Sequence, residues 1–215
     1  MIDVRMFTVG PLEENCFIVG KTGSDRAVIV DPGDDAERLL KAAEELGVTI
    51  DAILLTHTHF DHIGAVAPVA KATGAPVYCP ELETLVLANI MDFVPWPGFG
   101  PFESYSADHE VRGGDELELA GVTFDVLFTP GHSPGHVTYS VRGEDALLSG
   151  DVLFAGSVGR VDLPGGDWPT LLASLDLLVS SFPAETTVYP GHMGITTLGR
   201  EQATNPFLRE LAQQQ

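Results

Sequence analysis

The residues best suited to chemistry lie in one short run of the sequence, His57-Thr58-His59-Phe60-Asp61-His62. Imidazole and carboxylate groups bind Zn²⁺, Fe or Mn, and this run contains no thiolate donor. His57 and His59 lie two residues apart, so an extended backbone directs both to one side. Asp61 and His62 follow where a turn can direct them at a second ion, and two ions about 3.5–4 Å apart can hold a shared water as hydroxide. The run therefore predicts a two-metal centre.

Five short apolar runs, each predicted to be a β-strand, end within a few residues of an acidic residue or a histidine. The first run precedes Asp31, and the second precedes residues 57–62. The other three precede His132, Asp151 and His192. In layered α/β proteins the carboxyl ends of the strands meet at one edge, where loops carry ligand-binding groups. We therefore expect these side chains to gather at one edge of the fold.

Strand-like runs alternate with helical patterns, which predicts a layered α/β protein. The expected strands cover residues 15–19, 27–30, 52–55, 77–79, 117–119, 123–128, 138–141, 146–148 and 187–189. The expected helices cover residues 36–46, 63–71, 81–91, 167–179 and a polar segment from about Gly199. Asp34 or Asp35 is expected to cap the first helix and Gly47 to end it, whereas Asp167 is expected to start the fourth helix.

The composition is that of an ordinary globular protein and disfavours nucleic-acid or membrane partners, while a small anionic substrate stays possible because bound metal ions would reverse the local charge. The chain has 31 acidic residues against 11 basic ones, a formal charge of −20. Nucleic acids and anionic membranes require a basic surface, so neither is an expected partner. The first residues do not resemble a signal peptide and no apolar run is long enough to span a bilayer, which predicts a cytoplasmic protein. Cys16 and Cys79 have no metal-binding spacing and are expected to be small buried residues.

Residues 93–102 form an unusual segment that is rich in aromatic residues, proline and glycine. This composition excludes a regular helix or strand. Two interpretations stay open for the segment. It fills a gap at the surface of the core, or it forms an apolar wall beside a binding cleft.

The sequence resembles the metallo-β-lactamase superfamily over nearly its whole length. Residues 57–62 match the HxHxDH motif of that family, and the later motifs match in order and spacing. These are Thr129-Pro-Gly-His132, Gly150-Asp151 and Tyr189-Pro-Gly-His192. The resemblance implies an α/β fold of four layers, the αβ/βα metallo-β-lactamase sandwich, with residues 1–215 as a single domain and the metals at one edge.

The same resemblance implies which residues hold the metals. The implied ligands are His57, His59 and His132 for the first ion, Asp61, His62 and His192 for the second, and Asp151 as the bridge between them. Asp31 matches a family residue that supports the ligands from behind and does not bind metal. The implied cofactors are two divalent metal ions, with Zn²⁺ expected and Fe or Mn as alternatives.

Within the superfamily, the sequence resembles short relatives of the hydroxyacylglutathione hydrolases (glyoxalase II). The likeness is carried by residues 130–136, 154–160, 196–201 and 204–208. It implies hydrolysis of a small-molecule thioester by a metal-bound hydroxide, with Asp61 as ligand, orienting group and proton acceptor. Full-length glyoxalase II holds glutathione with basic residues of a C-terminal helical domain, whereas only Arg200 and Arg209 follow His192 here. The acyl group and the thiol carrier are left open. Met193 also stands where such relatives have glycine.

Other activities of the same fold are the alternatives. Persulfide dioxygenases share a Gly-Arg-x-Asp segment, here residues 159–162, and use one iron on the residues matching His57, His132 and Asp151. A lactonase or another ester hydrolase would use the same two-metal centre. Nucleases of the superfamily need a positive surface, which this acidic sequence does not predict. Flavodiiron proteins need an added flavin domain, for which the 215 residues leave no room.

Two residues near the expected ligands have open roles. Arg160 is a candidate to contact a substrate carboxylate, because its planar guanidinium suits that group; the alternative is a surface salt bridge. His136 follows His132 in a Pro-Gly turn. It either donates a hydrogen bond to the centre from behind or packs as a turn residue on the core.

Overall fold

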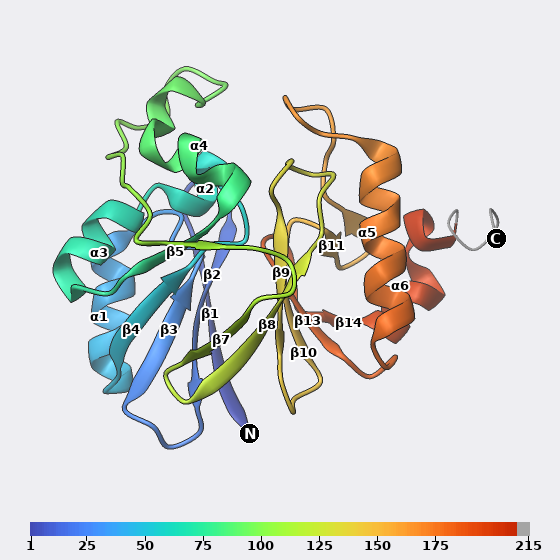
Figure 1. Ribbon diagram of the computed structural model, residues 1–215, viewed down its shortest axis with the longest axis horizontal. Helices are drawn as coiled ribbons and strands as arrows, with labels where there is room; N and C mark the ends of the chain where they lie inside the picture. The colour runs from blue at the N-terminus through green and yellow to red at the C-terminus, as the bar shows by residue number, and fades with distance from the viewer. Residues whose placement is uncertain (210–215) are drawn as a thin grey trace.

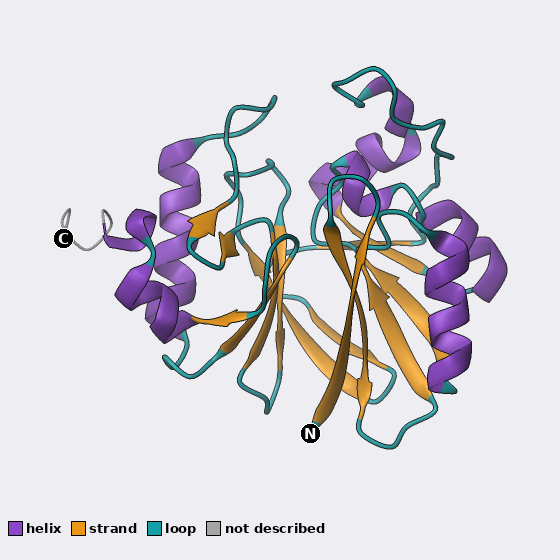
Figure 2. Cartoon of the chain, turned by 180° about the vertical axis from the view of Figure 1, so that it is seen from behind, coloured by secondary structure: helices purple, strands orange, loops and turns teal. Residues whose placement is uncertain are grey.

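The computed structural model describes residues 1–209, in which two six-stranded sheets pack face to face (Figures 1 and 2). The first sheet contains, in spatial order, β1 (Ile2–Val9), β2 (Glu14–Lys21), β3 (Arg26–Val30), β4 (Thr49–Leu54), β5 (Val77–Pro80) and β6 (His109–Val111). The second contains β14 (Thr196–Thr197), β13 (Thr187–Pro190), β10 (Ala146–Gly150), β9 (Val137–Val141), β8 (Val122–Phe128) and β7 (Glu116–Leu119). A small third sheet pairs β11 (Leu153–Phe154) with β12 (Ser157–Val158). Residues 210–215 of the expected domain lie outside the described part.

Helices cover the outer face of each large sheet (Figure 1). The α-helices of the described part are α1 (Ala36–Leu46), α2 (Phe60–Ile63), α3 (Val66–Thr73), α4 (Thr84–Ala88), α5 (Trp168–Ser181) and α6 (Leu198–Thr204). The first sheet is covered by α1 and α3, and the second by α5 and α6. Within residues 1–209, no helix combines the length and apolar character needed to cross a membrane.

Alternation along the strands of the first sheet produces two apolar layers, because successive side chains point to opposite faces. One set, Ile18, Ile29 and Ile53, faces the helices and packs with Leu39 of α1 and Val66 of α3. The other set, Phe17, Val28, Val30 and Leu54, faces the second sheet and packs with Phe124 of β8 and Tyr139 of β9. A third cluster joins the second sheet to α5: Leu147, Val188, Leu171, Leu175 and Leu178. The order of layers is helix, sheet, sheet, helix, so the predicted αβ/βα sandwich is confirmed.

Hydrogen bonds tie the two large sheets together at one edge of the sandwich. The Tyr139 hydroxyl donates to the carbonyl of Leu55, just beyond β4, at 2.8 Å. The backbone N–H of Asn15 donates to the carbonyl of Gly191 at 2.7 Å. Because β3 and β4 are parallel, as are β10 and β13, their carboxyl ends reach this edge together. The edge is therefore a fixed platform for the loops that follow those strands.

Two expected helices are interrupted in the structure. In place of a helix over residues 63–71 there are α2 and α3, separated by Gly64 and Ala65. Gly64 keeps a helical conformation, but Ala65 leaves it with φ −101° and donates its N–H to the carbonyl of Pro32, in the loop after β3, at 3.0 Å. In place of a helix over residues 81–91 there are α4 and two short 3₁₀ turns, because Asn89 leaves the helical conformation with φ −142°.

Other sequence-based expectations have mixed outcomes. Gly47 ends α1 in the left-handed conformation as expected, but Asp35 occupies the N-cap position without a side-chain capping bond. Its carboxylate lies 3.7 Å from Arg38 instead. Asp167 does cap α5, accepting from the N–H of Thr170 at 2.9 Å. The alternating edge strand β1 was not predicted. Cys16 and Cys79 are buried free thiols, as expected.

Candidate metal centre

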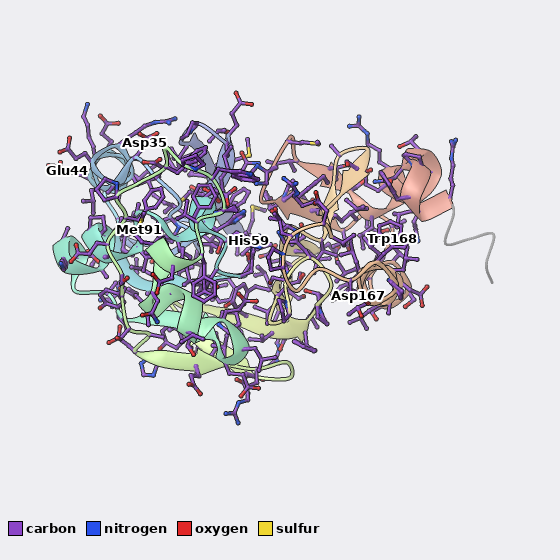
Figure 3. All side chains as sticks on the ribbon, turned by 90° about the horizontal axis from the view of Figure 1, so that it is seen from above. Asp35, Glu44, His59, Met91, Asp167 and Trp168 are labelled. Atoms are coloured by element: carbon purple, nitrogen blue, oxygen red, sulfur yellow. The ribbon has the colours of Figure 1, made fainter. Side chains whose placement is uncertain are left out.

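The structure brings all seven predicted ligands to the edge where the parallel strands end. His57 and His59 follow β4, and Asp61 and His62 lie in α2. The other three follow β8, β10 and β13: His132, Asp151 and His192. Figure 3 shows His59 between the half of the molecule that carries Asp35 and Met91 and the half that carries Trp168. Both sheets therefore contribute to the cluster.

The first predicted ligand group lies at the inner side of the cluster. Potential ligand atoms of His57, His59 and His132 all lie within 4.8 Å of one another. The Nδ1 atom of His59 is 2.8 Å from Nε2 of His132. Burial, with the neighbouring His132, lowers the pKa of His59 to about 3, and burial lowers the pKa of His57 and His132 as well. Their rings are neutral at pH 7, which is the form that binds metal.

The second predicted group, Asp61, His62 and His192, also has its ligand atoms within 4.8 Å. Nε2 of His192 is 3.3 Å from Oδ2 of Asp61. Burial opposes ionisation of Asp61, but the hydrogen bond from His192 and the charge of His62 outweigh it and lower the pKa of Asp61. Asp61 is therefore a carboxylate at neutral pH, able to bind a cation or accept a proton.

Asp151 lies between the two groups. Its Oδ1 is 3.3 Å from Nε2 of His62, and its Oδ2 is 3.4 Å from Nε2 of His132. Oδ2 is also 3.6 Å from Nε2 of His192. One carboxylate thus faces imidazoles of both groups. This is the placement that a bridging ligand requires.

Buried atoms without partners test whether these residues fit metal ions. Within residues 1–209, Nε2 of His57, Nε2 of His62 and Oδ1 of Asp151 are buried and have no hydrogen-bond partner. Buried polar atoms in folded proteins almost always have one. Neutral imidazoles and carboxylates are the donors that Zn²⁺, Fe and Mn accept. The site therefore fits divalent metal ions, although the individual ligand assignments stay predictions.

Asp31 lies behind the cluster with both of its oxygens engaged. Oδ1 accepts from the N–H of Thr56 at 2.7 Å, and Oδ2 accepts from the Thr56 hydroxyl at 2.6 Å. Oδ2 is also 3.1 Å from Nδ1 of His62. Such a contact fixes a ring so that its other nitrogen faces inward. The predicted role of Asp31 as a supporting group is compatible with these contacts.

Comparison with known proteins decides the family. The profile of the metallo-beta-lactamase superfamily matches residues 9–192. The chain belongs to this superfamily. It is accordingly a metal-dependent hydrolase of the metallo-beta-lactamase type.

Two relatives match this superfamily member over nearly their full length. The probable metallo-hydrolase YqgX of Bacillus subtilis is 40% identical over 209 residues, which cover 95% of this chain and 96% of the relative. The hydroxyacylglutathione hydrolase GloC of Haemophilus influenzae is 31% identical, with 96% and 98% covered.

Two solved structures are also similar. BLEG-1, described as a B3 metallo-beta-lactamase, is 41% identical with a TM-score of 0.89, covering 97% of this chain and 99% of its own. TTHA1623, described in a di-iron-bound form, is 44% identical with a TM-score of 0.85, covering 95% and 100%. The superfamily fold is thus shared at high identity by proteins with different descriptions.

A cavity of about 710 Å³ opens over the metal centre of this superfamily member. We call its metal-centre side the floor, which consists of His59, Asp61, His132, Asp151 and His192.

The aromatic segment at residues 93–102 contributes both to the cavity and to the packing beneath it. Phe93 and Trp96 line the cavity, whereas Phe99 and Phe102 pack on Phe60 with ring centroids 5.0 and 5.8 Å away. Both interpretations of the segment therefore describe part of it.

Arg160 lines the same cavity but is engaged with a neighbour. Its Nε and Nη2 donate to Asp162 at 2.6 and 2.7 Å. Its guanidinium carbon lies 5.6 Å from the ring centroid of Trp96. The salt-bridge interpretation matches these contacts, and a contact between Arg160 and a substrate carboxylate stays a prediction.

Glu83 is a buried residue whose role at the site the sequence did not reveal. Its Oε2 accepts from the Thr58 hydroxyl at 2.6 Å, and its Oε1 accepts from the Ser133 hydroxyl at 2.7 Å and from the N–H of Gly135 at 2.8 Å. Thr58 lies between two predicted ligands and Ser133 follows a third. Glu83 therefore links the two loops that carry the first ligand group.

His136 is buried behind the bridging residue. Its Nε2 accepts a hydrogen bond from the N–H of Asp151 at 3.0 Å, so the proton of the neutral ring is on Nδ1, 3.0 Å from the Thr129 hydroxyl. Burial lowers the pKa of His136, which favours this neutral form. Of the two roles left open for His136, donation toward the centre does not match this contact. It is an acceptor that orients the backbone of Asp151.

Proposed function

We propose that this protein hydrolyses thioesters of small molecules, in the manner of glyoxalase II, with two divalent metal ions held by the seven converging residues. Zn²⁺ is the proposed metal, with Fe and Mn as alternatives. When bound, such ions polarise a carbonyl oxygen and lower the pKa of water. The remaining chemistry falls to side chains of the cavity.

The titratable groups that line the cavity support a thioester as the substrate. Among the described residues, the lining contains carboxylic acids, imidazoles and Arg160, but no Lys, Tyr or Cys. All three of these imidazoles, those of His59, His132 and His192, are predicted ligands, so none of them is free to protonate a leaving atom. A thiolate leaves without protonation because thiols have pKa values of about 8.5. An amine leaving group, as in lactam cleavage, requires a proton and suits this cavity less well.

Asp61 is the proposed proton acceptor. It is ionised, is partly exposed to the cavity, and is oriented by Nε2 of His192 at 3.3 Å. A carboxylate in this position can accept a hydrogen bond from the attacking water and take its proton. The Asp61 side chain thereby fixes the direction from which water approaches the carbonyl carbon.

Relatives support the reaction type and leave the metal open. GloC carries the name of a hydroxyacylglutathione hydrolase and aligns over nearly all of this chain. TTHA1623 is described with two iron ions, which supports a dinuclear centre and keeps iron among the candidates. BLEG-1 is described as a beta-lactamase, so β-lactams belong in any substrate test.

The test is a substrate panel assayed on a sample whose metal content is measured at the same time. The panel contains thioesters, lactones, a chromogenic β-lactam, phosphodiesters and glutathione persulfide with oxygen uptake recorded. We expect thiol release from thioesters by protein with two metal ions per chain. Faster turnover of the β-lactam, or activity only on phosphodiesters, would overturn the proposal. One iron per chain with oxygen uptake on the persulfide would replace the hydrolase with a dioxygenase.

A further inference from the structure

The lining of the cavity changes from polar at the floor to mainly apolar above it. We call five apolar residues around its mouth the wall: Leu82, Phe93, Trp96, Leu163 and Met193. They come from four segments far apart in the sequence, namely the 3₁₀ turn before α4, the loop after α4, the loop between β12 and α5, and the loop after β13. An apolar surface assembled from four separate segments is a built feature of the cavity.

Most of the wall is exposed to solvent. The relative exposures are 59% for Leu82, 48% for Phe93, 37% for Trp96 and 54% for Met193. Exposed apolar side chains that gather in one place, unlike scattered ones, mark surfaces that bind an apolar partner or ligand. Because these four residues line the cavity that contains the metal centre, the ligand is one that reaches the reacting atoms.

Met193 adds a second, independent observation. Its φ is +67°, a left-handed conformation that side chains other than glycine rarely adopt. The Asn15 side chain fixes this backbone by donating to the carbonyls of Pro190 at 3.0 Å and Met193 at 2.8 Å. Strained non-glycine residues cluster at functional sites, where the strain is retained for the position it gives a side chain. Here the retained side chain is a flexible, apolar thioether beside the predicted ligand His192.

The charges around the cavity disfavour an anionic substrate. Above the floor, and apart from buried Glu83, the charged lining residues are Arg160 and Asp92. Arg160 is already paired with Asp162 through two hydrogen bonds. Two of its N–H groups are thus occupied and its charge is balanced by a neighbouring acid, and away from the metal ions the net charge of −20 disfavours a further anion. The wall therefore offers apolar contact, and the one basic residue of the described lining, Arg160, is already paired with an acid.

We propose that the substrates are uncharged, apolar thioesters and not thioesters of an anionic peptide thiol such as glutathione. This inference rests on the thioesterase function proposed above and names the substrate class for it. The non-reacting part of the substrate lies against the wall, and the thioester carbonyl lies over the floor. Burial of that apolar part, which grows with chain length, sets the preference among substrates.

The first experiment compares two carriers with identical acyl groups. Acetyl, butyryl, hexanoyl and octanoyl thioesters are made on N-acetylcysteamine, which is neutral, and on glutathione. We expect kcat/KM on the neutral carrier to rise by up to about fourfold for each methylene that becomes buried. For a given acyl group, the neutral carrier should exceed glutathione by at least about tenfold. A glutathione preference with no dependence on chain length overturns the inference and leaves the thioesterase function intact.

Variants of the wall then locate the effect. Trp96→Ala and Met193→Gly should each lower kcat/KM for the octanoyl thioester by about tenfold and leave the acetyl thioester within about twofold. Met193→Gly suits the left-handed backbone, so it removes the side chain without disturbing the fold. The matched controls are Leu85→Ala, at an exposed residue outside the cavity, and Ala120→Gly, at a left-handed residue (φ +52°) in the β7–β8 turn. Equal losses on both thioesters, or the same losses in the controls, contradict a role for the wall in selection.

Binding without turnover separates the two proposals. The chain has two tryptophans, so a Trp168→Phe protein reports on Trp96 alone. An uncleavable octyl thioether of N-acetylcysteamine should change its fluorescence, and the corresponding thioether of glutathione should bind at least about tenfold more weakly. If the octyl compound binds but no thioester is cleaved, the apolar ligand class stands and the thioesterase function falls. If neither compound changes the fluorescence of Trp96, the inference is wrong.

Discussion

The floor of the cavity consists of residues placed by strand ends and by α2, whereas the wall consists of loop residues. Floor residues are held from behind: His132 contacts the carbonyl of Arg160 at 2.8 Å, and the N–H of Asp151 donates to His136 at 3.0 Å. Wall residues such as Leu82 and Phe93 are exposed to solvent. A rigid floor fixes which reaction is feasible, and a loop-built wall sets which molecule reaches it.

This contrast explains why superfamily membership predicts chemistry better than substrate. BLEG-1 and GloC are both similar to this chain over nearly its full length, yet their descriptions name different substrates. Loops tolerate changes in sequence that buried strand ends do not. If the contrast holds, substitutions in the floor abolish turnover of every substrate, and substitutions in the wall change the order of preference.

The largest expected effect is in the floor, from Asp61→Ala. This substitution removes a predicted ligand and the proposed proton acceptor together. We expect kcat/KM to fall by about a thousandfold for all substrates, consistent with the several kcal/mol that metal catalysis contributes. The His57, His59 and His132 group is untouched, so metal analysis should find one ion where the parent holds two. The control is Asp3→Ala, at an exposed aspartate on β1. Full activity in Asp61→Ala would remove this residue from the mechanism.

A smaller loss is expected from Gly191→Ala, which crowds the floor without removing a ligand. A Cβ at Gly191 would lie 2.2 Å from Oδ1 of Asp151 and 2.6 Å from Cε1 of His62, so both side chains must shift. Displacing catalytic groups by about 1 Å can cost about a hundredfold in rate. Gly194→Ala is the matched control, since a Cβ there meets nothing within 4 Å. Similar activities of the two variants would show that the floor is less rigid than its contacts indicate.

The layer beneath the floor is tested by Glu83→Gln. The amide cannot accept hydrogen bonds at both ends, so either Thr58 or the Ser133 loop loses its partner. Groups that orient ligands typically contribute about 10–100-fold to metal affinity, and we expect a loss in that range by metal titration. Excess metal should restore kcat, which it would not do for a misfolded protein. Glu45→Gln, at an exposed glutamate of α1 that pairs with Lys41, should leave metal affinity unchanged. An unchanged affinity in Glu83→Gln would make its contacts structural only.

The same contrast describes how much the sequence could predict. The floor was predictable because His57, His59, Asp61 and His62 are near neighbours, and because each remaining ligand follows its own apolar strand. Glu83 could not be found in this way. Its partners Thr58 and Ser133 are 25 and 50 residues away, and only tertiary packing brings them together.

The wall and the two interrupted helices also could not be predicted from local sequence patterns. Helical periodicity predicted one helix over residues 63–71, but Ala65 leaves the helical conformation and its N–H bonds the carbonyl of Pro32, which separates α2 from α3. Residues 93–102 were correctly excluded from regular structure, but composition could not indicate which of their aromatic rings face the cavity. These outcomes depend on packing between distant segments, which no local pattern records.

The smallest expected effect is beside the wall, from Arg160→Gln, at a charged residue of the cavity lining. If Arg160 selected substrates through a carboxylate, its loss would raise KM strongly for an anionic thioester and not for a neutral one. Because its guanidinium is already paired with Asp162 and is about half exposed, we expect KM to change by less than about fivefold for either substrate, as for other exposed ion pairs. Arg112→Gln, at an arginine outside the cavity that pairs with Glu81, provides the baseline. A large rise in KM confined to the anionic thioester would give Arg160 a role in recognition and would contradict the apolar preference of the wall.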